Sequence, residues 1–146
     1  MIFVTVGTTR FEALIKEVDR LAANTISEPV LCQIGSGDYE PNHCEYFRFK
    51  PSIDDLIAQT DLLISHGGTT VLTALTTGVP VIAVANTALA DNHQEHYLRE
   101  IAEHVPLIWT NDPAEIGPLI EQYDRKPGRF DAPSLVPDLS DYLANI

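Results

Sequence analysis

The hydrophobic positions of this chain follow two spacings. Short runs of β-branched and aliphatic residues predict strands, and the longer segments between them repeat apolar residues every three or four positions, as amphipathic helices do. Phe11, Leu14, Ile15 and Val18, for example, form one apolar stripe. The pattern predicts six strands, at Ile2–Val6, Pro29–Ile34, Glu45–Phe49, Leu62–Ser65, Val79–Ala85 and Leu107–Trp109. It predicts helices at Arg10–Asn24, Ser52–Gln59, Thr69–Thr77, Asn92–His104 and Pro113–Gln122.

Strands that alternate with helices in this way are typical of βαβ units, in which parallel strands are joined by crossover helices. The sequence therefore predicts an α/β fold with a single Rossmann-like, doubly wound and mainly parallel sheet over residues 1–124. Residues 125–146 are rich in Pro and Gly and show no periodicity until a short final segment, Leu139–Leu143, which is able to form a helix. This tail either docks on a partner or is disordered.

Composition narrows the range of partners and compartments. The 146 residues include 9 Lys and Arg against 21 Asp and Glu, a formal net charge of -12. This balance opposes binding to nucleic-acid phosphates or anionic lipid. No apolar run approaches the roughly 18 residues of a membrane span, so we expect a cytoplasmic chain that does not itself cross a membrane. Cys32 and Cys44 lack the spacing of a zinc or redox motif, so a reduced pair is expected.

The loop after the first predicted strand is a candidate anion site. Ligands of open α/β sheets bind at the carboxyl ends of the strands, which directs attention to such loops. Here Gly7 lets the backbone approach a ligand, and Thr8 and Thr9 can donate hydrogen bonds to phosphate oxygens at the start of the next helix. A tight turn with a threonine cap is the alternative interpretation.

A second candidate loop follows the buried strand Leu62–Ser65. Gly67 and Gly68 leave amide groups uncovered at a helix N-terminus, and Thr69 and Thr70 can donate to a pyrophosphate there. His66 can bind a phosphate or a sugar hydroxyl, although a histidine at a strand end is as often a structural group. Phosphate binding and a purely structural turn both remain open for this loop.

A third loop offers donors and acceptors in four consecutive positions, as the orientation of a polyhydroxylated ligand requires. These are Asp91, Asn92, His93 and Gln94. An ordinary helix N-cap is the alternative. The segment 35–40, in contrast, lacks the third glycine of a dinucleotide fingerprint and is predicted to be a polar loop. The chain has no Asp-x-Asp pattern, and its histidines do not sit at ligand spacing apart from His93 and His96, which are not expected to face each other, so we expect no protein-bound metal.

Taken together, these motifs resemble a known family. The resemblance is carried, in order along residues 1–110, by Val4–Thr9, Phe11, Leu14, Ile15, Ser65–Gly68, Gly78–Pro80 and Asp91–Gln94. The chain is similar to the short catalytic subunits of two-part GT-B glycosyltransferases. These include the cytosolic subunit of the dolichol-pathway UDP-N-acetylglucosamine transferase and bacterial relatives in exopolysaccharide and capsule synthesis. More remotely, the chain resembles the carboxyl-terminal, donor-binding half of MurG, the peptidoglycan N-acetylglucosaminyltransferase.

The resemblance implies a UDP-sugar donor. Gly7 and Thr8 would lie near the diphosphate, residues 66–70 against phosphate and ribose, and residues 91–94 at the sugar hydroxyls. The uracil would be held by backbone near Phe49 and Lys50. The family often carries a ribose-binding Glu on the helix after the Gly-Gly loop. Thr73 stands at that position here, so weaker or differently organised nucleotide binding is expected.

The implied reaction is an inverting transfer of a hexose or N-acetylhexosamine from UDP to a lipid-linked acceptor, without a metal. Backbone amides and the hydroxyls of Thr8, Thr69 and Thr70 would stabilise the departing diphosphate. His66 and His93 are candidates for the general base, unless the base lies on the partner. The implied partner is a membrane-anchored glycosyltransferase subunit that binds the lipid-linked sugar acceptor. Two alternatives remain open: a noncatalytic nucleotide-sugar-binding or regulatory subunit, and a sugar-nucleotide epimerase of related fold.

Overall fold

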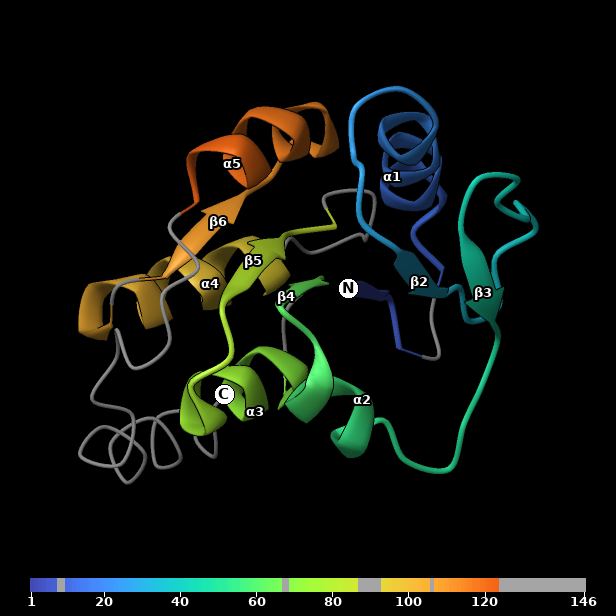
Figure 1. The fold of residues 1–146 in the computed structure, drawn as a ribbon. Coiled ribbons are helices and arrows are strands. Elements are labelled where there is room, and N and C mark those ends of the chain that lie inside the picture. The colour runs from blue at the N-terminus through green and yellow to red at the C-terminus, as the bar shows by residue number, and fades with distance from the viewer. Residues whose placement is uncertain (8–9, 67–68, 87–92, 106, 124–146) are drawn as a thin grey trace.

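The computed structural model describes residues 1–7, 10–66, 69–86, 93–105 and 107–123. Within this part of the chain the strands form one six-stranded sheet in the order β3-β2-β1-β4-β5-β6, and every pair is parallel (Figure 1). The strands are β1 (Ile2–Thr5), β2 (Val30–Gln33), β3 (Glu45–Phe47), β4 (Leu62–Ser65), β5 (Val81–Val84) and β6 (Ile108–Thr110). The predicted Rossmann-like, doubly wound α/β fold is confirmed.

Helices cover both faces of this sheet. They are α1 (Glu12–Asn24), α2 (Asp54–Gln59), α3 (Thr69–Thr77), α4 (His93–His104) and α5 (Ile116–Gln122), with a short 3-10 turn, η1 (Pro113–Glu115), directly before α5. In Figure 1, α1 and α5 lie on one side of the sheet and α2 and α3 on the other. The central strands are therefore buried on both faces, which is why they are continuous apolar runs in the sequence.

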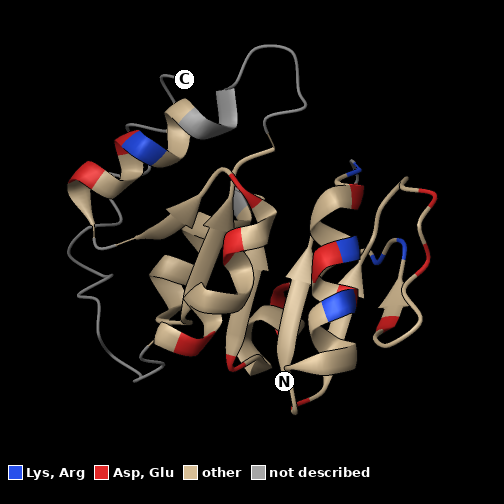
Figure 2. Ribbon diagram, turned by 90° about the horizontal axis from the view of Figure 1, so that it is seen from above, with Lys and Arg blue, Asp and Glu red and all other residues tan. Residues whose placement is uncertain are grey.

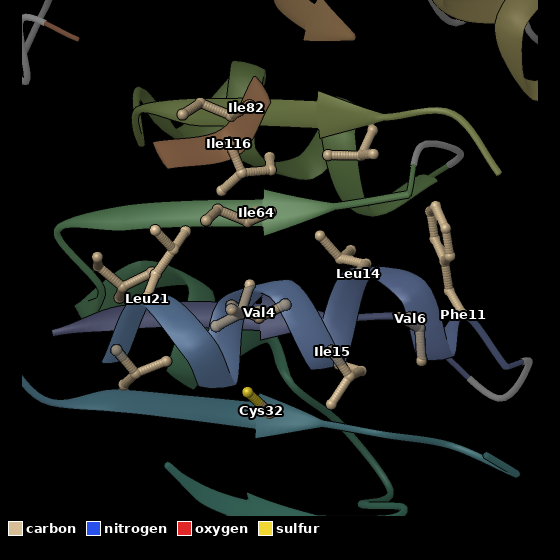
Figure 3. Packing of buried hydrophobic residues seen from close by; sticks show 14 of the residues in the cluster. Val4, Val6, Phe11, Leu14, Ile15, Leu21, Cys32, Ile64, Ile82 and Ile116 are labelled. Carbon is tan, nitrogen blue, oxygen red and sulfur yellow. The ribbon is translucent and has the colours of Figure 1, made fainter. Parts of the chain in front are cut away.

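Alternate residues of each strand enter two separate hydrophobic clusters. Ile2 and Val4 of β1 pack under α1 and α5, together with Ile64 and Ile82 of the neighbouring strands (Figure 3). Phe3 points to the opposite face, where it joins a cluster formed with α2, α3 and α4. This alternation follows from the two-residue period of a strand and places one core on each side of the sheet.

Gly78 ends α3 in the left-handed conformation, with φ of 76°. The N–H of Val79 donates to the Ala74 carbonyl at 2.9 Å, which is the six-residue hydrogen bond of a Schellman motif. Pro80 follows and cannot continue the helix. The Gly-Val-Pro sequence thus reverses the chain between α3 and β5.

All six strands and all five helices occur in the predicted order, but several boundaries differ. Helix α1 begins at Glu12 rather than Arg10, because Phe11 adopts a non-helical conformation and its side chain is buried in the core. Helix α2 begins at Asp54, with Ser52 accepting a hydrogen bond from the Asp54 N–H at 3.3 Å. The predicted tail, residues 125–146, lies outside the described residues.

Candidate functional site

The site lies where the strand order reverses. Strand β1 pairs with β2 on one side and with β4 on the other, so that Thr5 lies opposite both Gln33 and Ser65. The connections that leave β1 and β4 therefore start from adjacent strand ends and lead to opposite faces of the sheet. This topological switch point is where open α/β sheets bind their ligands.

Gly7 and His66 meet at this switch point. Gly7 has a φ of 63°, and a Cβ atom at this position would lie 3.5 Å from Nε2 of His66. The same nitrogen lies 2.8 Å from the Val6 carbonyl oxygen. Since a carbonyl oxygen only accepts, Nε2 carries the proton and donates it. Burial lowers the pKa of His66 from its usual value of 6.5, and backbone hydrogen bonds only partly oppose that effect, so the ring is neutral at physiological pH.

Two buried polar side chains connect β2 to the turn after β1. The hydroxyl of Thr5 donates to Oε1 of Gln33 at 2.5 Å, and the N–H of Gly7 donates to Oγ1 of Thr5 at 3.1 Å. On the other side of β4, Nδ2 of the buried Asn86, after β5, donates to the Arg10 carbonyl at 3.2 Å. Side chains from several strand ends thus hold the segment that follows β1.

A pocket of about 320 Å³ opens beside this segment. It is formed by the end of β2, the connection from β3 into α2, and the first turns of α3. Its lining residues are Gln33, Lys50, Pro51, Ser52, Ile53, Asp54, Ile57, Thr70 and Thr73. The volume is within the usual range for small-molecule sites, and the lining offers a cation, a carboxylate, an amide and hydroxyls. The pocket therefore provides donors and acceptors for a polar ligand.

The loop that connects β2 to β3 accepts hydrogen bonds from Arg48, which follows β3, and donates one to Glu12 of α1. The Arg48 guanidinium donates to the carbonyls of Gly35 and Gly37 at 3.2 and 2.7 Å, and the Glu12 carboxylate accepts from the Asp38 N–H at 3.1 Å. No helix begins there, so the polar loop predicted for residues 35–40 is confirmed.

Further along this connection, the buried carboxylate of Asp19 accepts from the Tyr39 hydroxyl at 2.6 Å and from the amides of Asn42 and His43 at 3.1 and 2.7 Å. Burial alone would raise the pKa of Asp19, but these hydrogen bonds outweigh it and lower the pKa. These contacts fix the entry to β3 and so the position of the pocket wall that follows it.

The chain as a whole is acidic, with a formal net charge of -12. Figure 2 shows Lys and Arg on α1, on α4 and beside β3, and Asp and Glu on most of the helices. Lys50 brings a positive charge to the pocket lining, where its Nζ lies 4.9 Å from the centre of the Phe47 ring. An anionic ligand would meet this cation at the pocket.

The structure brings part of the predicted site together. Thr70 and Thr73 line the pocket, and Lys50 lines it as well, whereas Phe49 is 58% exposed and is not among the lining residues. Gly7 and His66 lie close to each other at the ends of β1 and β4, but neither is among the lining residues. Thr69 begins α3, and His93 and Gln94 begin α4. The remaining predicted residues, Thr8, Thr9, Gly67, Gly68, Asp91 and Asn92, lie outside the described residues.

Sequence reasoning missed Gln33, Asp54 and Asn86. Gln33 is a polar residue at the end of an otherwise apolar strand, and Asn86 directly follows another. A buried polar residue needs a hydrogen-bond partner, so this position at the ligand-binding edge was an available signal. Nothing in the local sequence identifies the partners, which lie 28 residues away for Gln33 and 76 for Asn86.

Comparisons with known proteins show what this chain is similar to. The model of the glycosyltransferase family 28 C-terminal domain matches residues 1–121. The chain is 32% identical over 120 residues to the UDP-N-acetylglucosamine transferase subunit ALG13 of Mus musculus, covering 73% of this chain but 10% of that protein. It is 30% identical over 132 residues to ALG13 of Yarrowia lipolytica, covering 80% of this chain and 67% of that protein.

Solved structures show the same fold. The glycotransferase of kitacinnamycin superposes with a TM-score of 0.61 at 19% identity, over 98% of this chain and 38% of that one. The solution structure of ALG13 gives a TM-score of 0.58 at 20% identity, over 98% of this chain and 96% of that one. None of the helices in the described part of the chain has the length and apolar character needed to cross a bilayer.

Proposed function

This chain belongs to the glycosyltransferase family 28 C-terminal domain family, and from that premise we propose that it is the donor-binding subunit of a UDP-sugar-dependent glycosyltransferase. The proposed reaction transfers a hexose or an N-acetylhexosamine from UDP to a lipid-linked acceptor, with inversion, in polysaccharide or oligosaccharide biosynthesis. The observation that carries the proposal is the pocket at the switch point of the sheet, with Lys50 and Thr73 in its lining. The family resemblance implies that the uracil binds near Lys50 and the ribose near Thr73.

In the proposed complex, the uridine occupies this pocket and its diphosphate extends toward Gly7 and the N-terminus of α3. The positive end of the α3 dipole and the amides of its first turn favour an anion at that position. Thr8 and the segment 67–70 would complete the phosphate site, and the segment 91–94 would bind the sugar. We further propose that the reaction needs no metal, because these donors stabilise the departing diphosphate.

The two candidate histidines take different roles in this proposal. Both the Val6 carbonyl and the backbone of His66 itself hydrogen bond to the His66 ring, which stabilises the turn after β1. We therefore assign to His66 the role of holding the phosphate turn. The general base for the acceptor hydroxyl is then His93 or a residue of the partner.

A second polypeptide is part of the proposal. The similar mouse and yeast proteins are named as subunits of a transferase, and this chain spans about a tenth of the mouse protein. It covers 38% of the kitacinnamycin glycotransferase chain. We propose that a membrane-anchored subunit supplies the acceptor-binding half and recruits this chain to the cytoplasmic face of the membrane.

Calorimetric titration of the chain with UDP, UDP-N-acetylglucosamine, UDP-galactose and UDP-glucose, with and without magnesium, tests the proposal. We expect UDP to bind equally well in both conditions and one UDP-sugar to bind more tightly than UDP. A magnesium requirement would overturn the metal-independent mechanism, and failure of all four ligands to bind would overturn the donor-site assignment. Replacement of the family's usual Glu by Thr73 favours one alternative, a noncatalytic nucleotide-sugar-binding subunit. Sugar transfer by the reconstituted pair would exclude that alternative.

A further inference from the structure

A continuous chain of hydrogen bonds connects the pocket to the turn after β1. Gln33 is the last residue of β2, lies beside Thr5 in the sheet and is 4% exposed. Its Oε1 accepts from the Thr5 hydroxyl at 2.5 Å, and Oγ1 of Thr5 accepts from the Gly7 N–H at 3.1 Å. Gln33 also lines the pocket with Thr70 and Thr73. One side chain therefore contacts both parts of the candidate site.

The donor and acceptor roles along this chain have a fixed direction. The Gly7 N–H can only donate, so it uses a lone pair of Thr5 Oγ1, and the single hydroxyl hydrogen of Thr5 points to Gln33 Oε1. With Oε1 engaged in this way, the group that the Gln33 amide offers to a pocket ligand is Nε2, which carries two hydrogens. Because Gln33 lines the pocket, its Nε2 is the donor that this side chain can offer to a ligand there.

We propose that Gln33 binds and positions the nucleotide: its Nε2 donates to an acceptor oxygen of the bound nucleotide, while its Oε1 holds Thr5 and, through Thr5, the Gly7 turn. This inference rests on the proposed function, and it makes Gln33 the residue that couples the nucleoside pocket to the diphosphate turn. A carboxylate in place of the amide would still accept from Thr5, but it would turn an acceptor toward the oxygens of the nucleotide. Glutamate at this position therefore keeps the turn and loses the ligand.

Nucleotide titration of four variants of the full chain tests this proposal. Gln33→Glu is matched by Gln59→Glu, which makes the same change at an exposed position of α2, and Thr5→Val is matched by Thr77→Val at the exposed end of α3. We expect Gln33→Glu to weaken both UMP and UDP binding by about tenfold or more, because the hydrogen-bond donor is lost and a carboxylate then faces the oxygens of the nucleotide. Thr5→Val should weaken UDP binding more than UMP binding, because the Gly7 turn faces the diphosphate. Both controls should bind as the unmodified chain does.

Hydrogen exchange of the Gly7 amide in the nucleotide-free chain tests separately whether Gln33 holds the Gly7 turn through Thr5. Exchange should be faster in Thr5→Val and in Gln33→Leu and unchanged in Gln33→Glu, provided that each variant keeps the circular dichroism of the unmodified chain. Unchanged exchange in the first two variants would refute the hydrogen-bond relay, and unchanged UDP affinity in Gln33→Glu would refute the ligand contact. If the unmodified chain binds no UDP, the proposed function and the ligand contact both fail, whereas the exchange result still decides the relay.

Discussion

Replacement of Asp19 should show how strongly one buried carboxylate fixes the connection that leads to the pocket. The side chain of Asp19, on α1, is buried and accepts from the hydroxyl of Tyr39 and the amides of Asn42 and His43. Asp19→Ala leaves these three donors without their acceptor at a partly buried position. A hydrogen bond to a charged group contributes about 1.5–3 kcal/mol, but water can reach the exposed residues 42 and 43, so we expect a loss of about 3 kcal/mol.

Asp19→Asn should cost less, about 1 kcal/mol, for a specific reason. The amide oxygen can stay at the position of Oδ1, which receives the His43 amide, while the amide nitrogen takes the position of Oδ2 beside the Tyr39 hydroxyl. A tyrosine hydroxyl can reverse its role and accept from that nitrogen. The Asn variant therefore loses the charge and one amide contact but leaves fewer donors unpaired than the Ala variant.

Urea unfolding followed by the fluorescence of the single tryptophan, Trp109, measures both variants, with Asp55→Asn on the exposed surface of α2 as the control. Hydrogen bonds lower the pKa of Asp19 below its usual 3.8, so its stabilising effect is complete above that pH and is lost as the pH falls through the folded-state pKa. The difference between wild type and Asp19→Asn should therefore shrink in acid. An Asp19→Ala variant within about 0.5 kcal/mol of wild type near neutral pH would refute this account of the connection.

Three further predictions concern positions at and away from the site. Gly7→Ala should lower stability by about 1–2 kcal/mol in thermal unfolding, because the φ of Gly7 is 63°, and it should also weaken UDP binding. Gly78→Ala, with φ of 76° and open space at Cβ, should lower stability by a similar amount but leave UDP binding unchanged. Burial lowers the pKa of His66, so the unmodified chain should lose stability as the pH falls below about 6.5, and His66→Gln should lose less. If the melting temperature of both proteins fell equally between pH 7 and 5, this prediction would be wrong. Cys44 is partly exposed and Cys32 is buried, so iodoacetamide and mass spectrometry should find Cys44 modified in the folded chain and Cys32 only after unfolding.

The elements that the sequence predicted well are those whose burial requires a recognisable run of hydrophobic residues. Strands β4 and β5 are continuous apolar runs because helices cover both of their faces, and the structure buries every residue of both. The end of α3 was also predictable, because Gly78 supplies a left-handed conformation and Pro80 cannot continue a helix. Local sequence was sufficient in these cases because the physical cause was local.

The features that the sequence predicted poorly depend on contacts between residues far apart in the chain. Phe11 fits the helical apolar stripe, yet its side chain packs in the core from a non-helical backbone position, and α1 starts at Glu12, two residues later than predicted. The polar residue at the end of β2 was visible in the sequence, but its partner was not, because Thr5 is brought beside Gln33 only by the pairing of β1 with β2. Residues that line the pocket from the start of α2, such as Asp54, likewise become neighbours of Thr73 only in the folded sheet.

The chain after β1 is held at its described residues, Val6, Gly7 and Arg10, by side chains from the ends of three other strands. Gln33 holds it from β2 through Thr5, His66 holds it from the end of β4 through Val6, and Asn86 holds it from the end of β5 through Arg10. All three side chains are at least partly buried, so water competes poorly for these hydrogen bonds. A backbone that is already held at Val6, Gly7 and Arg10 loses less conformational entropy on binding than one that folds around its ligand. If Thr73 replaces the ribose-binding Glu of the family, as the resemblance implies, this preorganisation would offset part of the missing ribose contact.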